Sequence, residues 1–289
     1  MPSRAPLLNP IPPIAALTRR FQALSPHRPV KGLVRFSALL NRYAHYQGVI
    51  RLPGGVLMTL DSRQEAERWL LYSGNYQPAL TAFLKHHTPL HGTCLDVGAN
   101  LGFYALNFAQ WVGPQGHVVA AEANPALAER IARDVTHNGF EHMTIVDRPV
   151  HARVEPVTFY VSPSPGKSSI LTQHVADPVQ TLTLTSTTID HIAQDHGWQR
   201  LDVIKLDIEG NDCNALLGAR ETLTRFRPVI AFEYWHSTPL AIAEETFTML
   251  HDLGYHLEGL LRDSKRIPFD WRTAEDFKHL DIIGTFDGG

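Results

Sequence analysis

From Thr93 onward, short apolar runs alternate with longer segments whose apolar positions recur every three to four residues. The short runs have the length of buried strands, and the longer segments have the period of a helix that packs one face on a sheet. This alternation indicates a parallel sheet, because parallel strands need a crossover connection, which is usually a helix. We predict strands at 93–97, 117–121, 143–146, 202–207, 228–233, 255–260 and 281–286, and helices at 102–112, 125–138, 210–224 and 238–253.

These elements predict an α/β fold with a seven-stranded, mostly parallel sheet and helices on both of its faces. The alternation breaks between the third and fourth strands. There, 157–161 and 181–185 are rich in β-branched and aromatic residues, and 162–169 is rich in Pro, Gly and Ser. This composition predicts an inserted β-hairpin with a mobile tip.

The N-terminal part has a different pattern. Seven prolines fall in the first 29 residues, from which we predict a loose or docked arm without a continuous helix. A hairpin at 48–60 follows, then a helix that Asp61 and Ser62 cap, and another at 78–87. We therefore divide the chain into an arm and N-terminal cap at 1–90 and a Rossmann-like domain at 91–289.

Composition limits the classes of partner. The 289 residues are 44% apolar, and 26 basic against 29 acidic residues give a net charge of −3 without a long block of like charge. We therefore expect neither nucleic acid nor an anionic membrane surface as partner. The two cysteines form no disulfide framework and have no zinc-ligand spacing. No apolar stretch reaches the ~20 residues that cross a bilayer, and the proline-broken start is a poor secretion signal. We expect a cytoplasmic protein.

The segment 94–102 places two glycines between a predicted strand and a predicted helix. Glycine permits positive φ and lets a backbone approach a ligand closely, so Gly98, Asn100 and Gly102 are candidate cofactor-binding positions. Glu122 follows Gly102 by 122 − 102 = 20 residues, at the end of the next strand. This is the separation expected for an acid that binds ribose hydroxyls, so the segment predicts a nucleoside ligand.

Asp96, near the end of the first strand, narrows the choice of nucleoside. A dinucleotide-binding turn leaves the helix N-terminus open to pyrophosphate, and a carboxylate beside it would repel that group. The same carboxylate would attract the ammonium of an amino-acid moiety such as that of S-adenosylmethionine. We expect S-adenosylmethionine as the cofactor, and a nicotinamide dinucleotide stays as the alternative.

Four ionisable residues follow the later strands: Asp207, Glu209, Glu233 and His236. The carboxyl ends of these strands face the ligand edge of the sheet, where a carboxylate is expensive unless it is used or paired. All four are catalytic candidates, with His236 or Asp207 as the base that deprotonates an acceptor. Asp207, Glu209 and Glu233 are also oxygen ligands that suit Mg²⁺. The structural alternative is a buried ion pair between Lys205 and a neighbouring acid.

Two blocks of the sequence resemble the FkbM-type family of S-adenosylmethionine-dependent methyltransferases. The first is 95–104 with 122–125, and the second is 201–210 with 217–219, 227–228 and 232–233. The resemblance spans roughly residues 55 to 260 and implies a Rossmann-like class I methyltransferase. It also implies cofactor-binding roles for Asn124, in the first block, and for Asp147, which is the only acceptor for an adenine amine after the third strand. The chain departs from the family at Gln77, where members often carry Glu, and at 211–212, where they often carry Ala-Glu.

The resemblance implies methylation of a hydroxyl on a sugar or secondary metabolite. We therefore predict a methyltransferase that acts on a small-molecule or glycan acceptor, with S-adenosylmethionine and a possible Mg²⁺ as cofactors. The alternatives are methylation of a nitrogen in a small molecule or peptide, and a nicotinamide-dependent oxidoreductase. A non-catalytic binding module is disfavoured, because the chain keeps acids at several strand ends.

Overall fold

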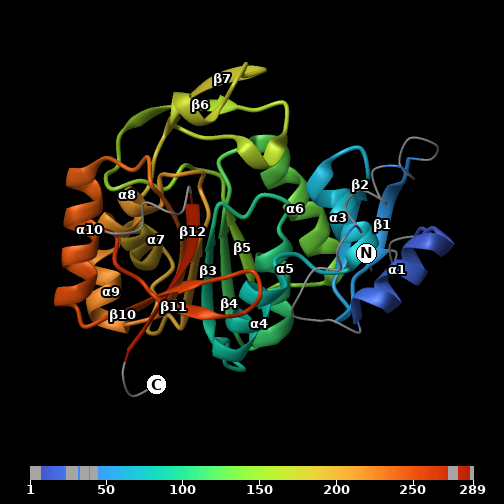
Figure 1. Ribbon diagram of the computed structural model, residues 1–289, viewed down its shortest axis with the longest axis horizontal. Helices are drawn as coiled ribbons and strands as arrows, with labels where there is room; N and C mark the ends of the chain where they lie inside the picture. The colour runs from blue at the N-terminus through green and yellow to red at the C-terminus, as the bar shows by residue number, and fades with distance from the viewer. Residues whose placement is uncertain (1–7, 24–31, 33–38, 40–44, 273–278, 287–289) are drawn as a thin grey trace.

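The computed structural model describes residues 8–23, 32, 39, 45–272 and 279–286. Its centre is an eight-stranded sheet, seen from the side in Figure 1. The strands are β3 (Thr93–Val97), β4 (His117–Ala121), β5 (Met143–Val146), β8 (Val203–Leu206), β9 (Val229–Trp235), β10 (His256–Leu260), β11 (Arg266–Pro268) and β12 (His279–Thr285), in the spatial order β11-β10-β12-β9-β8-β3-β4-β5.

The strands from β5 to β9 in this order pair in parallel, whereas β12 is antiparallel to both β9 and β10. The seven strands that the sequence predicts are present, so the mostly parallel α/β sheet is confirmed. The eighth, β11, was not predicted. It has only three residues, too few to show a period, and it pairs antiparallel with β10 at the edge of the sheet.

Helices cover both faces of the sheet. Strand side chains alternate between two apolar clusters: Cys94 and Val118 belong to one, and Leu95 and Val119 to the other. The first cluster includes residues of α5 (Phe103–Val112) and α6 (Pro125–Asn138), and the second includes residues of α7 (Ile189–Asp195), α8 (Asp212–Leu217), α9 (Arg220–Phe226) and α10 (Leu240–Asp252). No helix in the described part of the chain is long and apolar enough to cross a membrane.

The single helix predicted at 210–224 was wrong, because the chain forms two helices with a break at Gly218. A Cβ at Gly218 would lie 2.5 Å from the carbonyl oxygen of His151, so the backbone passes that loop too closely for a side chain. The Gly218 carbonyl accepts a hydrogen bond from the amide of Asp190, at the start of α7. Packing against α7 therefore interrupts the helix.

The N-terminal part consists of α1 (Pro13–Ala23), the hairpin of β1 (Gln47–Arg51) and β2 (Leu57–Asp61), α3 (Glu65–Ser73) and α4 (Pro78–His87). The prediction that the arm has no continuous helix was wrong. The prolines end at the first turn of α1, where a missing amide hydrogen costs nothing. The helix docks on the cap, since Arg19 donates to the carbonyl oxygen of Leu71 and the Thr18 hydroxyl donates to that of Tyr72.

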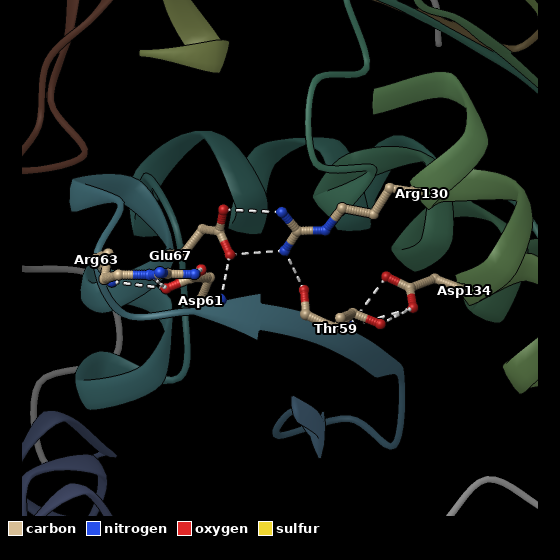
Figure 2. A network of polar contacts seen from close by, with 6 residues as sticks. All are labelled: Thr59, Asp61, Arg63, Glu67, Arg130 and Asp134. Carbon is tan, nitrogen blue, oxygen red and sulfur yellow. Dashed lines mark hydrogen bonds and ion pairs between the residues drawn. The ribbon is translucent and has the colours of Figure 1, made fainter. Parts of the chain in front are cut away.

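A stripe of polar side chains on α6 holds the cap hairpin against the Rossmann-like domain (Figure 2). Arg130, Asp134 and Asn138 are spaced four residues apart, so they lie on one face of the helix. Asp134 accepts from the amide and hydroxyl of Thr59, and Asn138 both donates to and accepts from the backbone of Leu57. Among the described residues, the outer edge of β2 thus bonds to helix side chains rather than to another strand.

Arg130 extends this contact to α3. Its guanidinium forms a bidentate ion pair with Glu67, at 2.8 and 2.6 Å, and donates to the carbonyl oxygen of Thr59. Both side chains are largely buried, with 14% of Arg130 and 2% of Glu67 exposed. Glu67 also accepts from the amide of Asp61. Because both partners are desolvated and joined by two hydrogen bonds, this pair fixes the position of α3 relative to α6.

The predicted insert is a hairpin of β6 (Pro156–Val161) and β7 (Gln180–Thr185), which pair antiparallel. It lies at the top of Figure 1, beyond the carboxyl ends of the parallel strands. Its connecting segment contains two short 3₁₀ helices, Pro165–Lys167 and Thr172–His174. Ser169 in this segment pairs with Tyr160 of β6. The connection is therefore folded back on the hairpin.

Candidate active site

A cleft lies at the carboxyl ends of the parallel strands, where an open α/β sheet usually binds its ligand. Three parts of the chain form its walls. The Rossmann-like domain contributes 97–101, 121–123, 148–150 and 207–209, the cap contributes Ala66, Leu70 and Tyr76, and the insert contributes Gly166 and 168–170. The cap and the insert are therefore part of the site.

The glycine turn lines the cleft, but its two glycines have packing roles. Gly98 has φ +74°, and a Cβ there would lie 2.0 Å from the carbonyl oxygen of Asp207. Gly102 has φ +81° at the start of α5, and a Cβ there would lie 3.1 Å from the side chain of Ile131. Gly102, also predicted to approach the cofactor, is not among the residues that line the cleft. Asn100, between them, lines the cleft.

Glu122 lies where its spacing predicts, on the cleft wall after β4. One carboxylate oxygen accepts from the amide of Asn100 at 2.7 Å, and the other accepts from the amide of Asn124 at 2.8 Å. The residue is 7% exposed. Burial raises the pKa of its carboxyl to about 7, and the two amide hydrogen bonds oppose that rise.

Asp96, which the sequence predicts as a cofactor-binding residue, is not among the residues that line the cleft. It is fully buried and lies opposite Lys205 in the β3–β8 register, with its Oδ1 3.2 Å from the Lys205 Nζ. Its other oxygen accepts from the amide of Ala105. The ion pair that we considered as the structural alternative is therefore present, and it involves Asp96.

Lys205 occupies the floor of the cleft. Its Nζ donates to the carbonyl oxygen of Gly98 at 3.3 Å and lies 3.8 Å from the Asp207 carboxylate and 5.2 Å from the centre of the Tyr104 ring. Burial lowers the pKa of this ammonium, but Asp96 and Asp207 outweigh that effect and raise it above its ordinary value. Lys205 therefore stays charged at neutral pH, which balances the carboxylates around it.

Carboxylates surround Asp207, as the strand-end pattern predicts. Burial, followed by the nearby charge of Asp207, raises the pKa of Glu209 to about 7 and that of Glu233 to about 9. The same causes raise the pKa of Asp212 and of Asp281 to about 7. Asp207 and Glu209 line the cleft, whereas Glu233 lies outside its wall and accepts from the Trp235 indole at 2.5 Å. The structure thus brings two of the three predicted acids into the cleft.

The predicted Mg²⁺ ligands do not fit a metal site. Within the described residues, no three Asp, Glu, His or Cys side chains are arranged to hold a metal ion, and this includes Asp207, Glu209 and Glu233. The cation beside Asp207 is instead the ammonium of Lys205.

Three other predicted residues lie away from the cleft wall. Asn124 caps α6 by accepting from the amide of Ala126. Asp147 is exposed, and the chain presents Arg148 and the two residues after it to the cleft instead. His236 is also exposed, because β9 continues to Trp235, two residues beyond the predicted strand end. His236 is not among the residues that line the cleft.

Several residues of the site were not predicted. Tyr76 of the cap lines the cleft and packs edge-to-face on Phe103 and Tyr104. The insert contributes Ser169 to the wall and brings His174 to the carbonyl oxygen of Glu209. The sequence predicted no site role for these residues, which lie in elements that a βα-repeat does not require.

Comparison with known proteins identifies the family. Residues 96–257, more than half of the chain, match the model of the Methyltransferase FkbM domain. The chain belongs to the FkbM methyltransferase family. It is therefore an S-adenosylmethionine-dependent methyltransferase, and the predicted family and class I fold are confirmed.

Other similarities are more distant. The chain is 38% identical to a protein-L-isoaspartate O-methyltransferase of Ignicoccus hospitalis over 52 residues. This match covers 18% of this chain and 25% of the length of that relative. A solved FkbM methyltransferase from Methylobacillus flagellatus is 15% identical, with a TM-score of 0.43 over 76% of this chain and 53% of that one. Fibrillarin from Aeropyrum pernix, solved with bound S-adenosyl-L-methionine, is 12% identical, with a TM-score of 0.43 over 82% of this chain and 81% of that one.

Proposed function

We propose that this methyltransferase binds S-adenosylmethionine in the cleft and methylates a hydroxyl of a small-molecule or glycan acceptor there. The observation that carries the proposal is the pair formed by Glu122 and Asn100. Both line the cleft, Glu122 as a buried carboxylate and Asn100 with a buried Oδ1 that has no hydrogen-bond partner among the described residues. A buried, unpaired oxygen is costly, so these two acceptors favour a ligand that carries several donors.

The cleft fits the parts of this cofactor. Glu122 is suited to accept hydrogen bonds from the two ribose hydroxyls, since each carboxylate oxygen keeps a lone pair after binding one backbone amide. The Asn100 oxygen is suited to a donor such as an ammonium. Residues 148–150, which follow the neighbouring strand, would form the wall beside adenine. When bound, the cofactor supplies an activated sulfonium methyl group.

The acceptor hydroxyl must lose its proton during the reaction, and Glu209 is the group best suited to take it. Its carboxyl lines the cleft, and its pKa of about 7 is close to neutral pH, where a general base works well. Asp207, also in the cleft, raises the pKa of Glu209 through its charge. Lys205 lies beside Asp207 and stabilises its negative charge. The Asp207 carboxylate, held in this way, would orient the acceptor.

The first experiment measures cofactor binding. S-adenosylhomocysteine at 100 times its dissociation constant should stabilise the fold by about 2.7 kcal/mol, and NAD⁺ should not. A shift with NAD⁺ alone would refute the proposal in favour of the oxidoreductase. Incubation of cell extracts with isotopically labelled S-adenosylmethionine, followed by mass spectrometry, would then identify the acceptor and show whether oxygen or nitrogen is methylated.

The second experiment tests the base in single-turnover methyl transfer, once an acceptor is identified. We expect Glu209→Gln to lower the rate by ~10²- to 10⁴-fold while S-adenosylhomocysteine affinity is kept. His236→Ala should have little effect, because His236 is exposed and lies outside the cleft. The opposite ranking of the two variants would restore His236 as the base.

We also propose that the enzyme acts in a reducing compartment such as the cytoplasm. Cys94 and Cys213 are both buried and free, which supports a location where thiols stay reduced. The modest net charge of −3 favours a small-molecule or glycan acceptor over nucleic acid.

A further inference from the structure

The connecting segment of the insert forms a roof over the cleft, which we define as Gly166 and residues 168–170. This roof contacts two turns at the strand ends: the glycine turn, which carries Asn100, and the turn after β8, which carries Glu209. A Cβ at Gly166 would lie 2.6 Å from the side-chain amide of Asn100, so the roof rests on the glycine turn. At its other end, the Ser169 hydroxyl donates to the carbonyl oxygen of Glu209 at 3.4 Å.

His174 makes the stronger contact with that carbonyl. Its Nδ1 lies 2.6 Å from the Glu209 oxygen, and because a carbonyl only accepts, Nδ1 carries the hydrogen. The imidazole also stacks on Trp235, with the ring centres 4.6 Å apart and the planes at 30°. A Cβ at Gly210 would lie 2.4 Å from this ring, so the backbone after Glu209 passes directly against it. The ring thus lies between Trp235, at the end of β9, and the backbone that follows β8.

We infer that His174 is a positioning residue for methyl transfer, which holds the roof closed on the cleft and fixes the backbone of Glu209. Glu209 has φ +54°, a conformation that a residue with a side chain adopts only when its surroundings hold it. The hydrogen bond from Nδ1 supplies that restraint. This inference rests on the proposed function, because it concerns the same cofactor cleft.

Two substitutions separate the contacts of His174. His174→Asn keeps a donor at the δ position but loses most of the stacking, whereas His174→Phe keeps a ring on Trp235 but loses the donor. Gln173→Ala, an exposed neighbour in the same 3₁₀ turn, is the matched control. Two measurements apply to the full chain: the affinity for S-adenosylhomocysteine by calorimetry, and the rate of trypsin cleavage after Lys167, an exposed residue within the roof turn.

We expect His174→Phe to bind S-adenosylhomocysteine about three- to tenfold more weakly, the loss expected for one hydrogen bond, and to be cleaved faster after Lys167. His174→Asn and Gln173→Ala should resemble wild type in both assays. Wild-type behaviour of His174→Phe, or damage by His174→Asn alone, would overturn the inference in favour of simple ring packing. Failure of the wild type to bind S-adenosylhomocysteine would refute the proposed function instead, and the cleavage ranking would still test His174.

Discussion

The affinity for S-adenosylhomocysteine should depend on pH through Glu122. This carboxyl has a pKa of about 7 in the folded protein, raised from 4.5 by burial. Ribose hydroxyls donate to a carboxylate, so they bind the ionised form in preference to the protonated one. If only the ionised form binds, the dissociation constant at pH 6 should be about tenfold larger than at pH 8, or about 1.4 kcal/mol.

The folding stability of the unliganded protein should respond to pH in the opposite direction. The folded state holds the Glu122 proton more tightly than the unfolded state does, so this group favours folding at low pH. Its contribution decreases as the pH rises from 4.5 to about 7, by about 3 kcal/mol at most for this shift. As the pH rises toward 7, cofactor affinity should therefore increase while the stability of the free enzyme decreases.

Calorimetric titration of the full chain with S-adenosylhomocysteine at several values between pH 6 and pH 8 checks the first expectation. Glu122→Gln should bind more weakly and show a nearly flat profile. Asp212→Asn is the matched control, since Asp212 is also a buried carboxyl with a pKa of about 7 that accepts from two backbone amides, yet it lies outside the cleft wall. A flat wild-type profile, or a tenfold change retained in Glu122→Gln, would refute this reasoning.

Three further outcomes concern the packing at Gly98, the Arg130–Glu67 ion pair and the acids of the cleft. Gly98→Ala should unfold the enzyme at much lower urea than Gly139→Ala, because a Cβ at Gly98 would lie 2.0 Å from backbone, whereas nothing lies within 4 Å at Gly139 and both have positive φ. Arg130→Met should cost about 3–5 kcal/mol in urea unfolding, and the double variant with Glu67→Met should recover part of that loss, because no charge is then left buried alone. Exhaustive chelation should leave labelled methyl transfer unchanged, and loss of activity that Mg²⁺ restores would contradict the metal-free site.

The sheet was predictable because each strand carries its own signal. Alternate residues of a buried parallel strand face two apolar layers, so runs such as 118–121 are apolar throughout and can be found without knowledge of their partners. The arm helix α1 was missed for a local reason. Prolines are frequent in the residues before it, so the proline-free segment after Pro13 was not recognised as a helix.

The site was less predictable, because its geometry depends on pairing between distant segments. Asp96 was expected to face the ligand, but the register between β3 and β8 places it opposite Lys205, a fact that only the pairing reveals. Glu122 lies in the cleft as its spacing predicts, since a distance along one βα unit is a local property. His174 reaches Glu209 from the connecting segment of the insert, which has no helical or strand period, so no local pattern indicated it.

The stripe on α6 has a consequence for the solubility of the chain. A two-stranded hairpin leaves a row of backbone donors and acceptors on each outer edge, and such edges recruit strands from other molecules. Arg130, Asp134 and Asn138 occupy those groups on β2 at Leu57 and Thr59, so the helix takes the place that a foreign strand would fill. A cap released from α6 would expose that edge together with a buried Glu67, and would be prone to self-association.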